Sequence, residues 1–404
     1  MNKIAIGYRP IKNVCVVGGG NEGHYFLALI GSRGDMRVSL LTRQPEVFQH
    51  EIVSLNTTNG METVGIVDRI SSNADEVIPD ADMVLFLVPS NTYKMYLDKV
   101  KMAVKPGTVL GFIPGTGGVE FAAKYFMDKG CPVFGTQRVP SGTKIVKKGY
   151  KVESLGSRKD LRVACMPSRL TGDVCRVLGE LLQIKTIALP NYLAVTLTPS
   201  NPILHTSRLY GLFHDYNQRI EYNRNLSFYK KWDNLSSEML LGCDDELQMC
   251  CKSLTRYDLS QVLPLREHYE IDRVSGDTDI ERMTNKIHHL DYLKDLVPMY
   301  QLKNGKFVPN FDSRYFTEDF PFGLAIIKAF CEICKINTPY IDKVLEWYDS
   351  LFQKGYYINK KFIGEGLKGL PIPQNYGITD IESLYSYYEG INNDTIYTNE
   401  VNLE

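Results

Sequence analysis

Residues 13–23 read Asn-Val-Cys-Val-Val-Gly-Gly-Gly-Asn-Glu-Gly and join an apolar run to a cluster of glycines. Their apolar half, Asn13–Val17, predicts a buried strand, and the glycines after it match the pattern G-x-G-x-x-G at Gly18, Gly20 and Gly23. An amphipathic stretch at Tyr25–Gly31 predicts a helix directly afterwards. Such a turn lets a diphosphate approach the backbone, and the helix N-terminus supplies N–H donors. The succession of strand, glycine turn and helix favours a dinucleotide site over a glycine-rich turn without a ligand.

The residues after the second expected strand bear on which dinucleotide binds. That strand is Arg37–Leu41, and an NAD site usually carries Asp or Glu at its end to hold the ribose hydroxyls. Here Thr42 and Arg43 follow, and the first carboxylate is Glu46. A hydroxyl and a guanidinium suit a 2′-phosphate, so we predict NADP as the cofactor, with NAD as the alternative. Arg43 could equally be a solvated surface residue without a ligand. The other predicted cofactor residues are Asn21, Glu22 and Pro89.

Strands and helices alternate through the first half and predict a doubly wound parallel sheet. The further expected strands are Asp82–Val88, Thr108–Ile113, Pro132–Gly135, Lys151–Leu155 and Leu161–Cys165. A helix is expected at Gly172–Leu182, and strand patterns end near Pro190. The clearest later helix begins with Thr338 as its cap and Pro339 at its first position. We therefore predict a Rossmann-type α/β domain over residues 1–190 and an all-α helical domain over residues 191–404.

Composition excludes several classes of function. The 404 residues carry 46 Lys plus Arg against 47 Asp plus Glu, which gives no long-range attraction to nucleic acid or an acidic membrane. No apolar run is long enough to span a bilayer, and no export signal is recognisable, so a cytoplasmic protein is expected. The nine cysteines are irregularly spaced, and we interpret Cys331 and Cys334 as core thiols rather than a redox or metal pair. No metal is predicted.

Three residues of the second half are candidates for acid–base and substrate chemistry. Asn201-Pro202 predicts a helix start that places His205 in the first turn, where the helix dipole disfavours the imidazolium and a buried carboxylate would offset that effect. Asp319 is such a carboxylate or an N-cap, and Arg314 either binds a carboxylate or pairs with Glu318. The histidines that compete with the first candidate are His24, His214, His288 and His289.

The chain as a whole resembles the octopine/nopaline (opine) dehydrogenase family. The resemblance rests on the glycine fingerprint from Gly18, on Arg-Tyr-Phe-Thr-Glu-Asp-Phe-Pro-Phe-Gly at residues 314–323, on the helix after Thr338 and on Pro373–Gly377. It implies a Rossmann domain followed by an all-α domain. It also implies the reductive joining of an α-amino acid to an α-keto acid, such as pyruvate, with NADH or NADPH.

The resemblance also implies roles for particular residues. His205 matches the family's acid–base histidine, Asp319 its aspartate partner, and Arg314 an arginine that holds a substrate carboxylate. Gln137 and Arg138 occupy a strand-end stretch that, in octopine dehydrogenase, carries Glu and Thr near the amino-acid site. A neutral amide beside a basic residue argues against a guanidinium-bearing amino acid, so a neutral or acidic one is expected.

Two other functions stay open at this point. A reductase of the glycerol-3-phosphate or ketopantoate type would act on a single carbonyl substrate and would need a lysine, for which Lys94 and Lys144 are the candidates. A non-catalytic NADP sensor would need the glycine turn but not the second-half residues. The expected partners are small molecules alone, without nucleic acid or membrane, and a homo-oligomer is left open.

Overall fold

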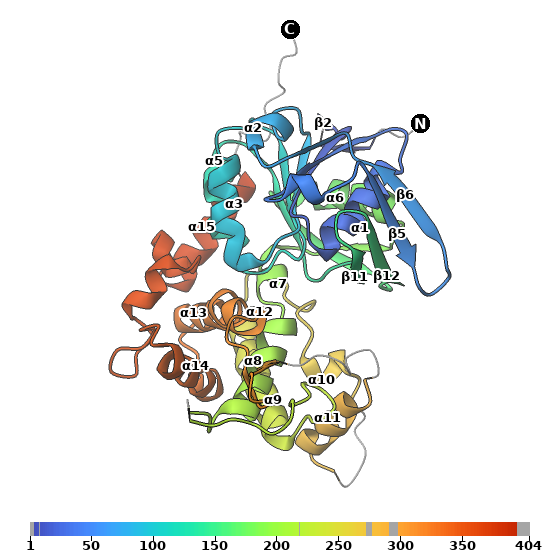
Figure 1. Cartoon of the computed structure of the whole chain (residues 1–404). Helices are drawn as coiled ribbons and strands as arrows, with labels where there is room; N and C mark the ends of the chain where they lie inside the picture. Colours follow the sequence, from blue (N-terminus) through green and yellow to red (C-terminus); the bar gives the residue numbers. More distant parts are fainter. Residues whose placement is uncertain (1–3, 8, 218, 272–276, 291–297, 394–404) are drawn as a thin grey trace. The chain divides into compact units, whose positions relative to one another are not determined.

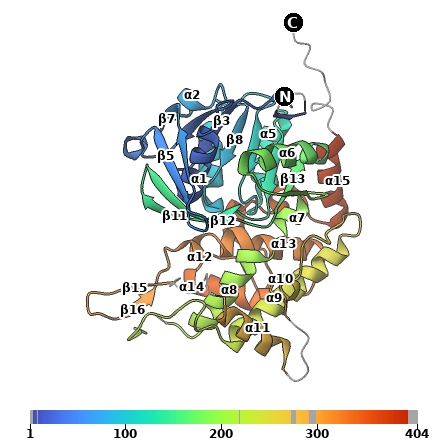
Figure 2. The same cartoon turned by 90° about the vertical axis from the view of Figure 1, so that its right-hand side faces the viewer.

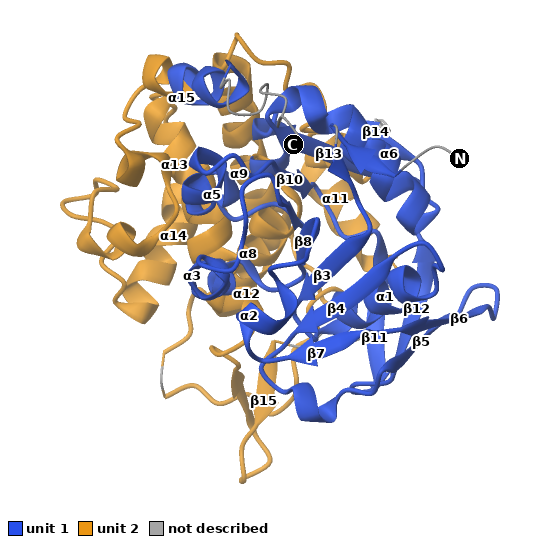
Figure 3. Ribbon diagram, turned by 90° about the horizontal axis from the view of Figure 1, so that it is seen from above, with its two compact units in different colours: residues 1–196, 385–404 blue, residues 197–384 orange. Residues whose placement is uncertain are grey.

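The computed structural model describes residues 4–7, 9–217, 219–271, 277–290 and 298–393. The chain forms two compact units, shown in different colours in Figure 3. Unit 1 comprises Met1–Thr196 and Tyr385–Glu404, and unit 2 comprises Leu197–Leu384. The sequence patterns predicted one helical domain over residues 191–404, whereas the structure groups residues 385–404 with unit 1.

The main sheet of unit 1 has eight strands in the order β14-β13-β10-β9-β8-β3-β4-β7. From β10 to β7 all neighbours are parallel, and the strand β13 is antiparallel to β10. The doubly wound sheet is therefore confirmed, with two strands, β13 and the β14 strand parallel to it, whose reversed direction the prediction did not include. The bounds are β14 Thr186–Ala188, β13 Leu161–Met166, β10 Val133–Thr136, β9 Val109–Phe112, β8 Met83–Phe86, β3 Asn13–Val17, β4 Arg37–Leu41 and β7 Arg69–Ser71.

Both faces of this sheet are covered, which explains the continuous apolar runs of β8 and β9. The helices α1 (Asn21–Gly31) and α6 (Thr171–Leu182) share one apolar core with the sheet. On the other side, Tyr93 of α3 (Tyr93–Val100) packs edge-on against Phe112, which stacks on Phe86 at a centroid distance of 4.6 Å.

Most of a second sheet of unit 1 was not predicted from the sequence. Its four strands run in the order β11-β12-β5-β6 and lie beside α1 (Figure 2). A Cβ on Gly65 would lie 2.4 Å from the carbonyl oxygen of Ala28, so glycine allows this strand to touch the helix backbone. The helix α1 is consequently buried nearly all round. The bounds are β11 Ser141–Lys147, β12 Lys151–Ser157, β5 Glu51–Asn56 and β6 Glu62–Ile66.

Unit 2 is mainly helical, with α8 and α9 packed against each other (Figure 1). The all-α prediction overlooked one hairpin, β15 (Met299–Gln301) with β16 (Phe307–Pro309), whose strands are too short to show a sequence pattern. None of the described helices is both long and apolar enough to cross a membrane. The helices are α8 Ser200–Phe213, α9 Asn234–Ser253, α10 Leu265–His268, α11 Asp279–His288, α12 Arg314–Thr317, α13 Ala325–Ile333, α14 Pro339–Phe352 and the start of α15 Ile381–Asn393.

The shorter elements of unit 1 connect these layers. They are β1 Ala5–Ile6, β2 Arg9–Pro10, α2 Ala74–Val77, α4 Val119–Ala122, α5 Lys124–Asp128 and α7 Leu193–Thr196.

The start of α14 differs from the prediction in its cap. Pro339 is the first helical residue, as expected, but the side chain of Thr338 makes no capping hydrogen bond. Its hydroxyl instead accepts from Lys328 Nζ at 2.6 Å. The N–H groups of Tyr340 and Ile341 donate to the carboxylate of Glu246, on α9, at 2.7 and 2.9 Å. A carboxylate distant in sequence thus replaces the local cap.

Cys331 and Cys334 are both free thiols and buried. The Sγ atom of Cys334 lies 3.6 Å from that of Cys250, so the two segments pack thiol against thiol. Within the described parts of the chain, no group of three or more His, Cys, Asp or Glu side chains is arranged to hold a metal ion.

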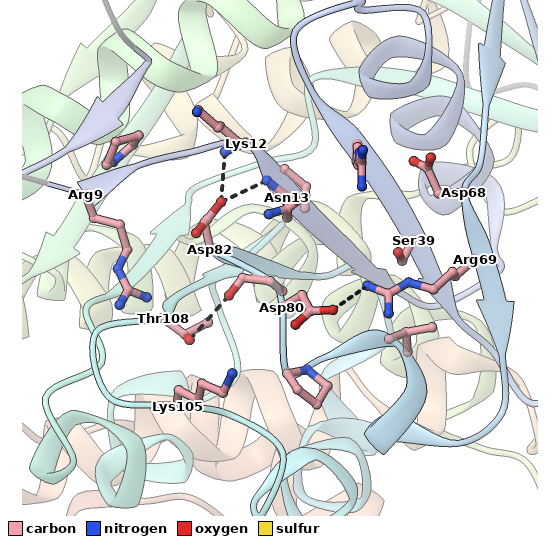
Figure 4. A pocket seen from close by; sticks show the side chains of 16 residues that line it. Arg9, Lys12, Asn13, Ser39, Asp68, Arg69, Asp80, Asp82, Lys105 and Thr108 are labelled. Carbon is pink, nitrogen blue, oxygen red and sulfur yellow. Dashed lines mark hydrogen bonds and ion pairs between the residues drawn. The ribbon is translucent and has the colours of Figure 1, made fainter.

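A cavity of about 940 Å³ opens at the N-terminal ends of β3, β4, β8 and β9 (Figure 4). Asp82 lies on its wall and accepts from the N–H groups of Lys12 and Asn13 at 2.9 Å, which ties two strand starts together. On the same wall Arg69 pairs with Asp80 at 3.2 Å. The glycine turn follows the carboxyl end of β3, so this cavity lies at the opposite edge of the sheet and is not the predicted cofactor site.

Candidate functional site

The glycine turn between β3 and α1 has the geometry that close approach of a diphosphate requires. Gly18 has φ +113°, and a Cβ there would lie 2.5 Å from Val88 Cγ1. A Cβ on Gly23 would lie 2.0 Å from the carbonyl oxygen of Gly18, so helix and turn touch backbone to backbone. At Gly20 a Cβ would meet nothing within 4 Å, which leaves space on the outer side of the turn. The turn therefore fits a dinucleotide diphosphate.

His24 braces this turn, a role that the sequence did not reveal. Its Nδ1 lies 2.7 Å from the carbonyl oxygen of Gly20, and its Nε2 accepts from the N–H of Gly149 at 2.7 Å. The N–H of Gly149 can only donate, so Nδ1 carries the ring proton and the imidazole is neutral. Burial lowers the pKa of His24, which keeps it neutral. No local signal marks this partner, because Gly149 belongs to the second sheet.

The side chains of Asn21 and Glu22 turn towards β11. The N–H of Ile145 donates to Asn21 Oδ1 at 3.1 Å, and the hydroxyl of Thr143 donates to Glu22 Oε1 at 2.5 Å. Burial raises the pKa of Glu22 to about 7. These two predicted cofactor residues are thus anchored to the second sheet, and they would offer a cofactor their backbone N–H groups rather than their side chains.

The other predicted cofactor residues lie at the carboxyl ends of strands. Thr42, after β4, is buried, and a Cβ on Gly19 would lie 3.0 Å from its Oγ1, so its hydroxyl lies beside the glycine turn. Arg43 is exposed. Pro89, after β8, uses its carbonyl oxygen to accept from the hydroxyl of Thr92 at 2.7 Å. A hydroxyl beside the turn and an exposed guanidinium next to it are compatible with a phosphorylated ribose.

Gln137 and Arg138 follow β10 in unit 1. The side chain of Gln137 is nearly buried, and its Nε2 donates to the carbonyl oxygen of Ala194 at 2.6 Å. The carbonyl oxygen of Arg138 accepts from the hydroxyl of Thr136 at 2.8 Å. Each residue is therefore held at this strand end by a hydrogen bond between a side chain and a backbone carbonyl oxygen.

His205 lies on α8 in unit 2, but not in its first turn. The helix begins at Ser200 with Pro199 as its N-cap, so the predicted start at Asn201-Pro202 was late. The error arose because Pro202 fits any position of the first turn, where its missing N–H costs no hydrogen bond. His205 is consequently in the second turn, where the helix dipole acts more weakly on the imidazole.

Asp319 is hydrogen-bonded to this histidine. Its Oδ2 lies 2.8 Å from His205 Nδ1, with side chains only 12% and 10% exposed respectively. Burial raises the pKa of Asp319, while the facing imidazole opposes that rise. The N-cap interpretation was wrong, because Asp319 makes no side-chain capping bond to the π-helical segment Phe320–Leu324 that follows it. The carboxylate is directed at the ring.

Aromatic side chains surround the imidazole of His205. The ring of Tyr315 packs edge-on at a centroid distance of 4.8 Å, and Phe228 packs at 5.6 Å. The hydroxyl oxygen of Tyr229 lies 3.1 Å from Nε2. Burial raises the pKa of Tyr315 to about 12, so it carries no charge near neutral pH. The walls exclude water and strengthen the electrostatic contact between the imidazole and Asp319.

Arg314 forms an ion pair with Glu318, which was one of the two roles predicted for it. Its guanidinium lies 2.6 Å from Glu318 Oε2, and its side chain is 67% exposed. It is also the first residue of α12, only five positions before Asp319. The arginine is therefore close to Asp319 in the chain and accessible to an anionic ligand that displaces Glu318.

The competing histidines and lysines have other partners. His214 lies 3.2 Å from Asp215, an exposed carboxylate, whereas His288 and His289 bond to backbone carbonyl oxygens. Lys94 is exposed and pairs with Asp98 at 2.8 Å, and Lys144 is exposed as well. Of the seven histidines, His205 is the one for which a hydrogen bond to a buried carboxylate is found in the described structure. The arrangement can hold and move one proton at a buried ring nitrogen.

Comparison with known proteins finds the chain similar to octopine, opine and tauropine dehydrogenases. The family model described as NAD/NADP octopine/nopaline dehydrogenase, alpha-helical domain, matches residues 188–352. Tauropine dehydrogenase of Arabella iricolor is 27% identical over 394 residues, covering 91% of this chain and 98% of that protein. Opine dehydrogenase of Haliotis discus hannai is 28% identical over 400 residues, covering 92% and 98%. A solved structure of octopine dehydrogenase with NADH and L-arginine has the same fold, with a TM-score of 0.80 at 23% identity and coverage of 95% and 98%.

Proposed function

Residues 188–352 match the helical domain of the octopine/nopaline dehydrogenase family, and from that premise we propose that the chain is an NAD(P)H-dependent opine dehydrogenase. It would condense an α-amino acid with an α-keto acid such as pyruvate and reduce the resulting imine to an N-(carboxyalkyl)amino acid. The observation that carries this proposal is the buried His205–Asp319 pair, because the reaction needs one group that first accepts and then returns a proton.

His205 is the proposed acid–base group. The amino group must lose a proton before it attacks the keto carbonyl, and His205 Nε2 is the site that receives it. The same proton then returns to the carbinolamine hydroxyl, which leaves as water. Asp319 holds the ring by Nδ1 and stabilises its charged form. Bound at the glycine turn, the nicotinamide cofactor would supply the hydride that reduces the imine.

Arg314 is the proposed anchor for a substrate carboxylate. A guanidinium binds a carboxylate through two parallel hydrogen bonds, and such a fork fixes the orientation of the substrate as well as its position. Arg314 uses Nε and Nη2 on Glu318, so the substrate carboxylate would take over those donors. Gln137 and Arg138 bring no carboxylate to their strand end, which supports a neutral or acidic amino acid over a guanidinium-bearing one.

The experiment that tests the function is optical. NADPH oxidation is followed with pyruvate plus each common amino acid, and the series is repeated with NADH. We expect oxidation only when both an amino acid and the keto acid are present, with arginine among the poor substrates. Oxidation with a keto acid alone would assign the protein to the simple reductases. Binding of NADPH without oxidation, across several keto acids, would favour the sensor.

The preference for NADP is a separate part of the proposal and rests on Thr42 and Arg43. We expect Arg43→Ala to raise the KM for NADPH by about tenfold, because one charge-assisted hydrogen bond to the 2′-phosphate is lost. The KM for NADH should not change, since NADH lacks that phosphate. The matched control is Arg37→Ala, which removes an exposed arginine at the opposite end of the same strand. Equal effects on both cofactors would remove Arg43 from the site.

A further inference from the structure

Both ring nitrogens of His205 are occupied by protein groups. Asp319 Oδ2 lies 2.8 Å from Nδ1, and the hydroxyl oxygen of Tyr229 lies 3.1 Å from Nε2. A carboxylate can only accept, so in the neutral imidazole Nδ1 carries the ring proton and Nε2 is bare. The hydroxyl of Tyr229 must then donate to Nε2. The single lone pair of the nitrogen that the proposed reaction needs is therefore already occupied, so a substrate cannot donate to it while Tyr229 does.

Packing holds Tyr229 in place. Its side chain is buried, with the residue only 2% exposed. Its ring lies nearly parallel to that of Trp232 and packs edge-on against Phe228 at a centroid distance of 4.9 Å. Trp232 is itself buried, donates its N–H to the carbonyl oxygen of Tyr229 at 3.0 Å, and donates Nε1–H to Ser237 at 2.8 Å. Turning the ring away would break up this cluster.

Arg208 fixes the loop that carries the tyrosine, residues 227–233. This arginine lies one turn after the imidazole on α8 and is fully buried. It donates to the carbonyl oxygen of Phe228 at 2.6 Å, to that of Lys231 at 2.5 Å and to Asp233 Oδ2 at 2.7 Å. A buried guanidinium is tolerated only when its donors are satisfied, so the loop and the helix are held together as one piece.

Resting on the proposed function, we propose that the acid–base proton passes between substrate and His205 through the hydroxyl of Tyr229. In the first step the N–H bond of the substrate ammonium breaks as an O–H bond forms on Tyr229. The original O–H bond of Tyr229 breaks as an N–H bond forms at Nε2. Dehydration reverses both transfers and delivers the proton to the carbinolamine hydroxyl, which leaves as water. Tyr229 ends each cycle as a neutral phenol, and no oxidant or reductant is consumed.

The test compares wild type with Tyr229→Phe, which keeps the ring and removes the relay oxygen. The matched control is Tyr348→Phe, which also removes a buried hydroxyl from unit 2; that hydroxyl donates to the carbonyl oxygen of Phe316 at 3.1 Å. For each protein we would measure kcat and KM for the coupled reaction, the solvent deuterium isotope effect on kcat, and the melting temperature.

We expect Tyr229→Phe to lower kcat by about 100-fold, the lower end of what general acid–base catalysis contributes, with KM changed little. Its solvent isotope effect should exceed that of wild type, because proton transfer becomes rate-limiting. Tyr348→Phe should match wild type in both. A kcat within threefold of wild type, an equal fall in both variants, or a fall without a larger isotope effect would overturn the relay. Absence of coupled turnover in wild type would instead refute the proposed function.

Discussion

Replacing His205 with Gln is expected to lower kcat of the coupled reaction by about 100- to 10,000-fold. Glutamine keeps a polar side chain of similar reach but cannot take up and return a proton near neutral pH. The variant also leaves Asp319 without the partner that now stabilises its buried charge. Cofactor binding should persist, because the glycine turn belongs to unit 1 and His205 to unit 2. Steady-state turnover and NADPH titration by fluorescence would measure the two effects separately.

The matched control for this prediction is His214→Gln. His214 is the C-cap residue of the same helix, and its ring faces an exposed aspartate rather than a buried one. The same substitution there should leave kcat within about twofold of wild type, since most surface substitutions have small effects. If His205→Gln retained near-normal turnover, the base would have to be another group, and the Tyr229 relay would lose its acceptor as well.

Local patterns were sufficient to predict most of the main sheet of unit 1. The strand bounds expected at β3 and β4 agree with the structure residue for residue, because each strand is a buried apolar run with a glycine turn or polar residues at its end. The strands β8, β9 and β13 are also where the apolar runs predicted them, with ends that differ by one or two residues.

The second sheet shows where local patterns were insufficient. In β6 three of the five residues are exposed, so the strand has no apolar run to detect. In β11 the only apolar side chains are Ile145 and Val146, which lie between two lysines, and four of the seven residues are exposed. These strands form because α1 needs cover on its outer face, which is a tertiary requirement that the local sequence does not contain. His24, whose partner lies on the turn between β11 and β12, was unrecognised for the same reason.

The candidate site in unit 2 depends on long-range contacts. His205 and Asp319 are 114 residues apart in the chain, and no spacing rule links two side chains over that distance. The family resemblance paired them, and the structure places them within hydrogen-bond distance. Tyr229 was not singled out at all, because a tyrosine in a loop between two helices has no distinguishing pattern. Its contact depends on Arg208, a buried arginine that the sequence presents as an ordinary helix residue.

Glu120 gives the second large effect, on stability and its dependence on pH. The residue is fully buried in α4 of unit 1. Its Oε1 accepts from the hydroxyls of Thr196 and Tyr388 at 2.6 and 2.9 Å, whereas its buried Oε2 has no hydrogen-bond partner in the described structure. Burial penalises the charged form and raises the pKa of Glu120 from 4.5 to about 7. The surroundings of the carboxyl group therefore stabilise its neutral form relative to its ionised form.

The sign of the pH effect follows from linkage. Below pH 4.5 the carboxyl is protonated in both folded and unfolded chains, so its contribution to stability is fully present. As pH rises through about 7, the unfolded chain ionises first and that contribution is lost. At 1.36 kcal/mol per pH unit the loss is roughly 3 kcal/mol. Glu120→Gln cannot ionise, so its free energy of unfolding relative to wild type should increase by about that amount between pH 4.5 and pH 8.

Denaturant unfolding of both proteins at the two pH values would measure this difference. Other buried carboxyls, such as Glu22 and Glu246, titrate in both proteins and cancel in the comparison. Glu46→Gln, the same change at an exposed glutamate of unit 1, should leave the pH dependence as it is in wild type. An equal stability difference at both pH values would mean that Glu120 keeps its charge in the folded protein. The orphan oxygen would then need a donor that the hydroxyls of Thr196 and Tyr388, both already directed at Oε1, do not supply.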